Sequence, residues 1–298
     1  MSYFTRASRR LHYQLLTCED ASAPLVVYIH GLLMDNLSSG YFTFAHRLRE
    51  RAHVLLYDLF GHGRSDLEPE GYRPSDHIAD LTGLITEVTR ELGHSSAHES
   101  EVSAPPVLII GCSYGGVLAL KAARDIAQVK RVILLEGHLG HESFVRQLRA
   151  DLSATGAEAE SLLAQHFQHW FHRGSERKRR RLETRARRLI YESSLIADLE
   201  AEPLRLEEWL TPEALNLPIN ALYGEESDAL SATRSLISQR ATAGATHDHL
   251  KIFTGKTHAL LWEATEEVID ELECCVERAK ALQLRGEERA LNSALFTT

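Results

Sequence analysis

Short apolar runs alternate with amphipathic segments along most of the chain. Continuous apolar runs predict strands that are buried on both faces, and they lie at 25–29, 53–57, 107–110, 130–135, 219–223 and 250–253. Apolar residues at helical spacing predict helices packed on one face, at 41–51, 76–92, 117–124, 229–240 and 261–282. A further segment, 9–17, alternates between polar and apolar residues and predicts an antiparallel strand. Repeated strand–helix alternation predicts the α/β class, with a mostly parallel central sheet and helices on both faces.

The pattern changes between residues 140 and 213. This stretch has no strand signal, and its apolar residues fall at helix-like spacing. We therefore expect an α/β core built from residues 1–139 and 214–298, interrupted by an all-helical cap at 140–213. Residues after Arg285 are expected to form a tail.

Composition narrows the setting of the molecule. The 298 residues are 44% hydrophobic and carry a net charge of −9, which gives no general argument for nucleic-acid binding. No apolar run reaches the roughly 20 residues that a membrane span requires, and the N-terminal residues lack the apolar segment of a signal peptide. The four cysteines, at 18, 112, 274 and 275, follow no disulfide framework. We expect reduced thiols and a cytoplasmic protein.

The stretch 107–117, read VLIIGCSYGGV, carries the strongest chemical signal. A buried strand leads into Gly111-Cys112-Ser113-Tyr114-Gly115, which fits the pattern G-x-S-x-G, and a helix follows. A serine at the tip of such a strained turn exposes its Oγ, and the two glycines leave room for the backbone to fold back. Ser113 is the predicted nucleophile.

A serine hydroxyl needs a base, and the base needs an acid to orient it. His258 stands in a short loop after the last predicted strand, where it can reach Ser113. Asp228, five residues after the strand that ends at Tyr223, is the preferred acid. Glu136, at the end of the strand that follows the serine, is the alternative. The N–H groups of Leu32 and Tyr114 are the predicted oxyanion donors, because Leu32 follows a strand end and Tyr114 follows the serine.

Five motifs in order resemble the α/β-hydrolase superfamily, in the serine-nucleophile branch that holds esterases and thioesterases. They are His30-Gly31, Asp58-Leu59-Phe60-Gly61-His62-Gly63-Arg64-Ser65, Gly111-Cys112-Ser113-Tyr114-Gly115-Gly116, Gly224-Glu225-Glu226-Ser227-Asp228 and Gly255-Lys256-Thr257-His258. They span nearly the whole chain apart from the cap and the tail. The resemblance implies acyl transfer through an acyl-serine, without a metal or cofactor, but it does not identify the substrate.

The leading function is therefore hydrolysis of an ester or thioester with an apolar acyl group. The same site could serve acyl transfer, cyclisation, C–C hydrolysis or a lyase step, and a hydrolase-like ligand receptor is the alternative from another class. A receptor of this kind often lacks the base or the acid, whereas this chain has both residues.

The predicted cap contains two features that bear on the substrate. Candidate substrate-binding residues are His30 in the core and Phe167, Trp170, Phe171 and Trp209 in the cap. The stretch 173–188 holds nine basic residues and two glutamates. It is either a solvated helix face or a dock for an acyl-carrier protein or the phosphates of a CoA thioester. His166, His169 and His172 have helical spacing but lack an accompanying carboxylate or cysteine, so we expect no metal site.

Overall fold

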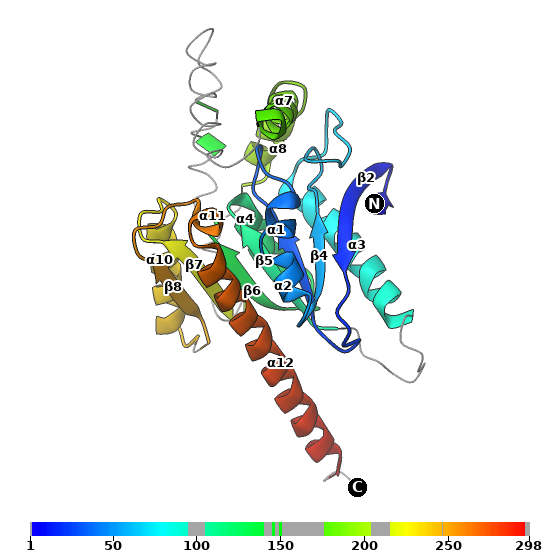
Figure 1. The fold of residues 1–298 in the computed structure, drawn as a ribbon, viewed down its shortest axis with the longest axis vertical. Coiled ribbons are helices and arrows are strands. Elements are labelled where there is room, and N and C mark those ends of the chain that lie inside the picture. The colour runs from blue at the N-terminus through cyan, green and yellow to red at the C-terminus, as the bar shows by residue number, and fades with distance from the viewer. Residues whose placement is uncertain are drawn as a thin grey trace.

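The computed structural model describes residues 2–94, 105–139, 145–146, 149–150, 176–203, 215–245 and 247–295. Its strands are β1 (Ser2–Arg6), β2 (Arg9–Leu16), β3 (Leu25–Ile29), β4 (His53–Tyr57), β5 (Val107–Cys112), β6 (Val129–Leu135), β7 (Ile219–Gly224) and β8 (His249–Phe253). They form one eight-stranded sheet in the order β1-β2-β4-β3-β5-β6-β7-β8. Only the β1–β2 and β2–β4 pairs are antiparallel. The sheet confirms the predicted α/β class, and its order places β5 near the centre (Figure 1).

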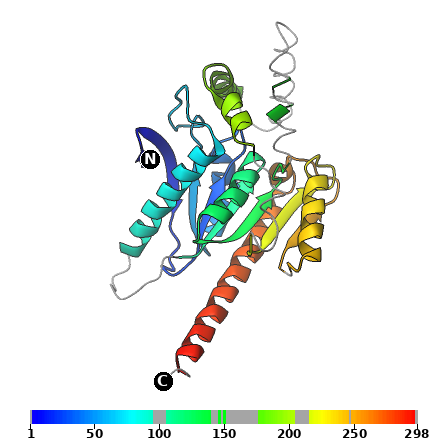
Figure 2. The same cartoon turned by 180° about the vertical axis from the view of Figure 1, so that it is seen from behind.

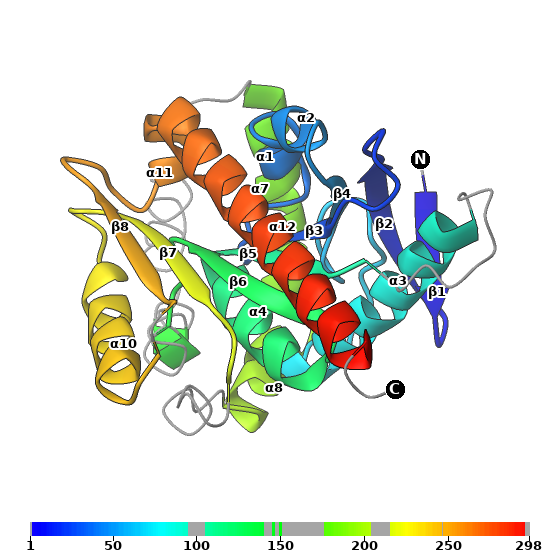
Figure 3. The same ribbon diagram turned by 90° about the horizontal axis from the view of Figure 1, so that it is seen from below.

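Helices cover both faces of this sheet. They are α1 (Ser38–Tyr41), α2 (Ala45–Leu48), α3 (Pro74–His94), α4 (Tyr114–Asp125), α7 (Glu176–Tyr191), α8 (Leu195–Ala201), α10 (Leu230–Thr242), α11 (Leu260–Glu263) and α12 (Thr265–Leu295). Apolar side chains of α3, α4 and α10 pack on one face, which Figure 2 presents to the viewer. The other face packs against α2, α11 and α12, and Figure 3 shows α12 running diagonally across it.

Side-chain alternation explains why one sheet supports two cores. In β3, Val26 and Tyr28 pack into the core beside α12, whereas Leu25, Val27 and Ile29 pack into the core beside α4. All five residues are buried, as a strand covered on both faces requires. The parallel strands β3, β5, β6, β7 and β8 therefore end at a common edge, and loops at that edge can bring chemical groups together.

Several element boundaries differ from the predictions. The predicted helix 41–51 is two short helices, α1 and α2, separated by Phe42 to Phe44. The last predicted helix, 261–282, is longer than expected, because α12 continues through the first part of the expected tail to Leu295. Its C-terminal part projects beyond the sheet at the end opposite α7 (Figure 1).

Within the predicted cap, α7 and α8 are the two longest segments that the structure describes. Both are helical, and α7 buries the apolar stripe Leu182, Ala186, Leu189 and Ile190 against the core. Its basic residues occupy the rest of the helix surface. The division into core and cap at residues 140 and 213 stays a prediction, since these boundaries lie outside the described residues.

Candidate active site

Ser113 lies at the turn between β5 and α4, with a backbone φ of 51° and ψ of −119°. A positive φ is strained for a residue with a side chain. The flanking glycines explain how the turn closes. A Cβ at Gly111 would lie 2.4 Å from the carbonyl oxygen of Gly115, and one at Gly115 would lie 2.2 Å from that of Ile29. The G-x-S-x-G pattern therefore presents Ser113 at the carboxyl edge of the sheet.

His258 reaches Ser113 from the loop between β8 and α11. Its Nε2 lies 3.3 Å from the Ser113 Oγ, although the two residues are 145 positions apart in the chain. The imidazole side chain is 12% exposed, so it remains accessible from the solvent side. The structure thus brings together the predicted nucleophile and the predicted base.

Glu136 provides the carboxylate that contacts His258. It directly follows β6, has a φ of 56° and is 1% exposed. Its Oε2 lies 3.1 Å from the His258 Nδ1. Because Nδ1 donates to the carboxylate, Nε2 is left with the lone pair that can accept the serine proton.

Two donors from the loop after β7 hold the Glu136 carboxylate. The backbone N–H of Gly224 donates to Oε1 and the Ser227 hydroxyl donates to Oε2, each at 2.5 Å. A buried carboxylate needs such partners, because burial without them is costly. Ser227 is a residue that sequence reasoning did not select, since a serine inside a polar loop carries no distinctive pattern.

The prediction that Asp228 is the acid is not supported by this geometry. Asp228 is exposed, and the carboxylate at His258 belongs to Glu136. The physical reason is the path of the loop after β7, which turns Ser227 inward to Glu136 and leaves its neighbour outside. The negative charge of Asp228 acts instead on His138, where it favours the protonated imidazole and so raises its pKa.

His138 lies beside the pair. Its backbone N–H donates to the Ser113 carbonyl oxygen at 3.0 Å, and its ring centroid is 6.4 Å from that of His258. Burial lowers the pKa of His138, an effect that Asp228 partly opposes. We expect His138 to be neutral at pH 7 and to limit the space next to His258.

The loop after β3 carries one predicted oxyanion donor. A Cβ at Gly31 would lie 3.3 Å from the Ser113 Cβ, so this loop runs directly beside the nucleophile. Leu33 adopts a φ of 64°, and its N–H donates to the His62 Nε2. Tyr114 is the first residue of α4, where N–H groups point out of the helix end. Both positions suit the predicted roles of Leu32 and Tyr114, which stay predictions.

His30 is placed differently from the prediction. It is fully buried, its Nε2 accepts the Leu59 N–H, and its Nδ1 lies 2.6 Å from the Gly31 carbonyl oxygen. Both ring nitrogens are therefore used inside the protein. His30 holds the loop after β3 against the loop after β4 and is not positioned to contact a substrate.

Internal hydrogen bonds of the loop after β4 explain its sequence motif. Asp58 accepts from the N–H groups of Leu37 and Arg64, and the Ser65 hydroxyl donates to the Asp58 carbonyl oxygen. Gly63 has a φ of 50°, and a Cβ there would lie 2.2 Å from the Asp58 carboxyl carbon. These residues shape the loop whose His62 accepts the Leu33 N–H.

Cys112 is a poor rival to Ser113. Desolvation raises the pKa of its thiol well above the ordinary value, so the thiolate is scarce at neutral pH.

Several predicted cap residues lie outside the described residues. They are Phe167, Trp170, Phe171 and Trp209, and the histidines at 166, 169 and 172. Among the residues that are described, no group of three or more His, Cys, Asp or Glu is arranged to hold a metal ion.

A family model described as "Alpha/beta hydrolase family" matches residues 26–271. The chain belongs to this family. It is accordingly an α/β-hydrolase enzyme. A search of curated protein sequences finds no significant match to this α/β hydrolase.

Solved structures share the fold of this α/β hydrolase at low sequence identity. An esterase, RhEst1, from Rhodococcus sp. ECU1013 is 16% identical with a TM-score of 0.67, over 92% of this chain and 97% of its own. An esterase from Exiguobacterium antarcticum is 15% identical with a TM-score of 0.66, over 93% and 99%. The enol-lactonase from Burkholderia xenovorans LB400 is 19% identical with a TM-score of 0.64, over 91% and 98%. Across the described part of this chain, no helix is both long and apolar enough to cross a membrane.

Proposed function

We propose that this α/β hydrolase is a serine esterase or thioesterase that works through an acyl-serine. The contact chain from Ser113 Oγ to His258 Nε2, at 3.3 Å, and from His258 Nδ1 to Glu136 Oε2, at 3.1 Å, carries the proposal. The esterases and the lactonase with the same fold support this reaction class. The assembled base and acid argue against a receptor that has lost catalysis.

In the first half-reaction, the Ser113 Oγ forms a bond to the substrate carbonyl carbon while its proton passes to His258 Nε2. The carbonyl oxygen becomes an oxyanion, which the N–H groups of Leu32 and Tyr114 would stabilise. The bond to the leaving alcohol or thiol then breaks, and His258 returns the proton to it. Glu136 stays ionised and stabilises the imidazolium.

In the second half-reaction, His258 removes a proton from water, and the water oxygen attacks the acyl carbonyl. The tetrahedral intermediate collapses, the acid leaves, and Ser113 regains its proton. The acyl group is expected to be apolar, since the cap stretch contains Phe167, Trp170, Phe171 and Trp209 as candidate lining residues.

A fluorophosphonate label tests this assignment through the intact mass of the protein. We expect one adduct on the wild type and none on Ser113→Ala. Glu136→Gln should slow labelling by about 10³-fold or more, because it removes the charge that orients and stabilises the imidazole. Asp228→Asn is the matched control, since Asp228 is exposed, and it should label at close to the wild-type rate.

Two results would contradict the proposal. An adduct that persists in Ser113→Ala would place the nucleophile elsewhere. Slow labelling of Asp228→Asn together with normal labelling of Glu136→Gln would return the acid to Asp228.

A further inference from the structure

A basic pocket of about 1200 Å³ lies between α7, the loop after β4, α1 and β2. Seven basic side chains and two carboxyl groups line it. The carboxyl groups are already engaged: Asp58 holds its own loop, and Glu176 pairs with Arg180. The pocket therefore presents an excess of positive charge in a concave space, which is the electrostatic requirement of an anion site.

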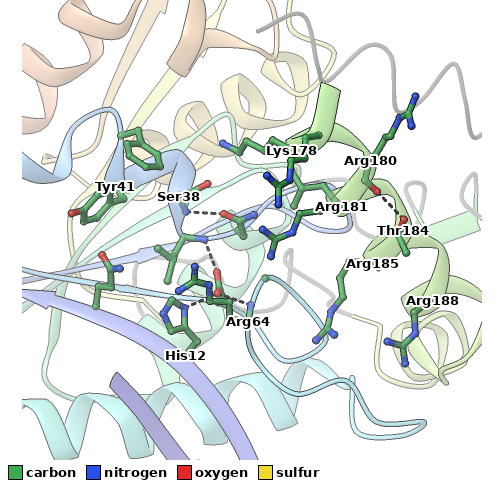
Figure 4. Close-up of a pocket in the computed structure, with 18 of the residues that line it drawn as sticks. His12, Ser38, Tyr41, Arg64, Lys178, Arg180, Arg181, Thr184, Arg185 and Arg188 are labelled. Carbon is green, nitrogen blue, oxygen red and sulfur yellow. Dashed lines mark hydrogen bonds and ion pairs between the residues drawn. The ribbon is translucent and has the colours of Figure 1, made fainter. Parts of the chain in front are cut away.

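The basic side chains differ in what they do. Arg185 donates to the carbonyl oxygens of Gly61 and Ser65, and so ties α7 to the loop after β4. Arg188 pairs with Glu192. The Arg181 side chain makes no ion pair or hydrogen bond with another residue that the structure describes. Figure 4 shows Arg181 reaching from α7 towards Arg64, and Lys178 reaching towards Tyr41, while Arg180 points away.

A buried imidazole at the base of the pocket supplies a second, independent observation. His12 lines the pocket, is 3% exposed, and has its Nδ1 2.8 Å from the Asp58 Oδ2. Its Nε2 is buried and has no hydrogen-bond partner within the described part of the protein. Because Nδ1 donates to the Asp58 carboxylate, Nε2 keeps a lone pair. Buried polar atoms are usually paired, so this nitrogen, one of several unpaired atoms in the described residues, suits a hydroxyl or amino donor on the organic part of a ligand.

The rim of the pocket adds an aromatic surface. Phe42 is 73% exposed, packs edge-on against Tyr41, and lies 5.8 Å beneath the Lys178 ammonium group. An exposed aromatic side chain next to cationic groups suits a ligand that has both a flat organic part and negative charges.

We propose that this pocket binds the phosphate groups of a small organic phosphate. Guanidinium groups match the geometry of phosphate oxygens, and a concave pocket encloses a small molecule rather than a protein surface. The basic residues of α7 would then form one wall of a binding pocket instead of a helix face that only contacts solvent.

The phosphate could have one of two sources. It could belong to the carrier part of a thioester substrate, an idea that rests on the proposed function, or to a free metabolite. Pocket residue Asn36 is only five residues after Gly31, which adjoins Ser113. Five residues of chain span at most about 18 Å, so a carrier held here is within reach of the nucleophile along the loop after β3.

Calorimetric titration of the full chain with adenosine 3′,5′-bisphosphate tests the phosphate site directly. We expect the bisphosphate to bind and adenosine to bind much more weakly, with affinity falling as salt is raised. Arg181→Gln and Arg64→Gln should each weaken binding by about tenfold or more, the usual loss for a charge-assisted hydrogen bond. Arg179→Gln is the matched control, because Arg179 is on the same helix but does not line the pocket.

Three outcomes would overturn the proposal. The first is equal affinity for adenosine and the bisphosphate, and the second is equal loss of binding in Arg179→Gln and Arg181→Gln. The third is an acidic acyl-carrier protein that binds through Arg181 while the bisphosphate does not bind, which would make this face a protein-binding surface.

Hydrolysis of two thioesters separates the two sources. Octanoyl-CoA carries the phosphates, and the octanoyl thioester of N-acetylcysteamine lacks them. For a substrate carrier, Arg181→Gln lowers kcat/KM for octanoyl-CoA by about tenfold and leaves the short thioester unchanged. For a free metabolite, both thioesters are unaffected while bisphosphate binding is still lost. Hydrolysis of neither thioester, with binding intact, would count against the proposed function alone.

Discussion

At the residue scale, the arrangement around Glu136 decides how His258 is oriented. The carboxylate is buried, and its two oxygens receive the Gly224 N–H, the Ser227 hydroxyl and the His258 ring. Ser227 acts only through Glu136, so it is a positioning residue. Its hydroxyl fixes the carboxylate at the angle that His258 needs.

Ser227→Ala should therefore reduce kcat/KM by about tenfold, since a hydrogen bond to a charged group contributes about 1.5–3 kcal/mol. The expected loss is in kcat rather than KM, and the lower limb of the pH–rate profile should move because His258 faces a less fixed carboxylate. Ser231→Ala, an exposed serine four residues further on, is the control. An unchanged pH profile with an unchanged kcat would show that Gly224 alone suffices.

The sequence singled out Ser113 and His258, which the structure places in contact, and it left the acid open between Asp228 and Glu136 with a preference for Asp228. Ser113 and His258 stand in motifs whose local geometry follows from neighbouring residues. The acid depends on how the loop after β7 turns, and this turn leaves Ser227 buried and Asp228 exposed. His30 shows a similar limit, because one of its two ring contacts is the Leu59 N–H, 29 residues away in the chain.

At the element scale, α4 must approach the sheet closely for Ser113 to be presented. A Cβ at Gly116 would lie 2.6 Å from the Gly137 Cα and one at Gly115 would meet the end of β3, so these two positions of α4 have no room for a side chain. The sequence predicted this strand–turn–helix unit because close approach demands glycine. It could not predict β1, which pairs only with β2 at the sheet edge.

Gly115→Ala should destabilise the protein by about 1–3 kcal/mol or more, because its Cβ would lie 2.2 Å from a backbone oxygen that cannot move easily. Gly93→Ala is the control. A Cβ at Gly93 meets nothing within 4 Å near the end of α3, so that change should be neutral or stabilising by up to about 1 kcal/mol. Urea unfolding measures both, and equal stability of the two variants would contradict the close-approach argument.

At the scale of the whole molecule, several histidines are buried in the neutral form. Burial lowers the pKa of His53 and His138, takes that of His62 well below its ordinary value, and lowers that of His77 to about 3. Below pH 6.5 these histidines bind protons in the unfolded chain but stay neutral in the folded chain until a lower pH is reached. Folding stability must therefore fall as the pH drops from 6.5 towards these lower values.

His77 alone should remove about 2 kcal/mol of folding stability between pH 7 and pH 5, approaching a limiting slope of about 1.4 kcal/mol per pH unit. Denaturant unfolding across this range measures the slope. His77→Gln is expected to lower stability at every pH, but to reduce the slope by about one proton. A slope identical to that of the wild type would show that His77 takes up its proton in the folded state.

The carboxyl ends of β6 and β7 converge on a single imidazole, and each is followed by an acidic residue. Glu136 occupies the contact, and Asp228 stands only one residue from the serine that supports it. A carboxylate after β6 and a carboxylate after β7 are thus two alternative ways to orient the same histidine. An evolving lineage could carry both carboxylates, shift the orienting role from one strand to the next by a small change of loop path, and retain its histidine and serine throughout.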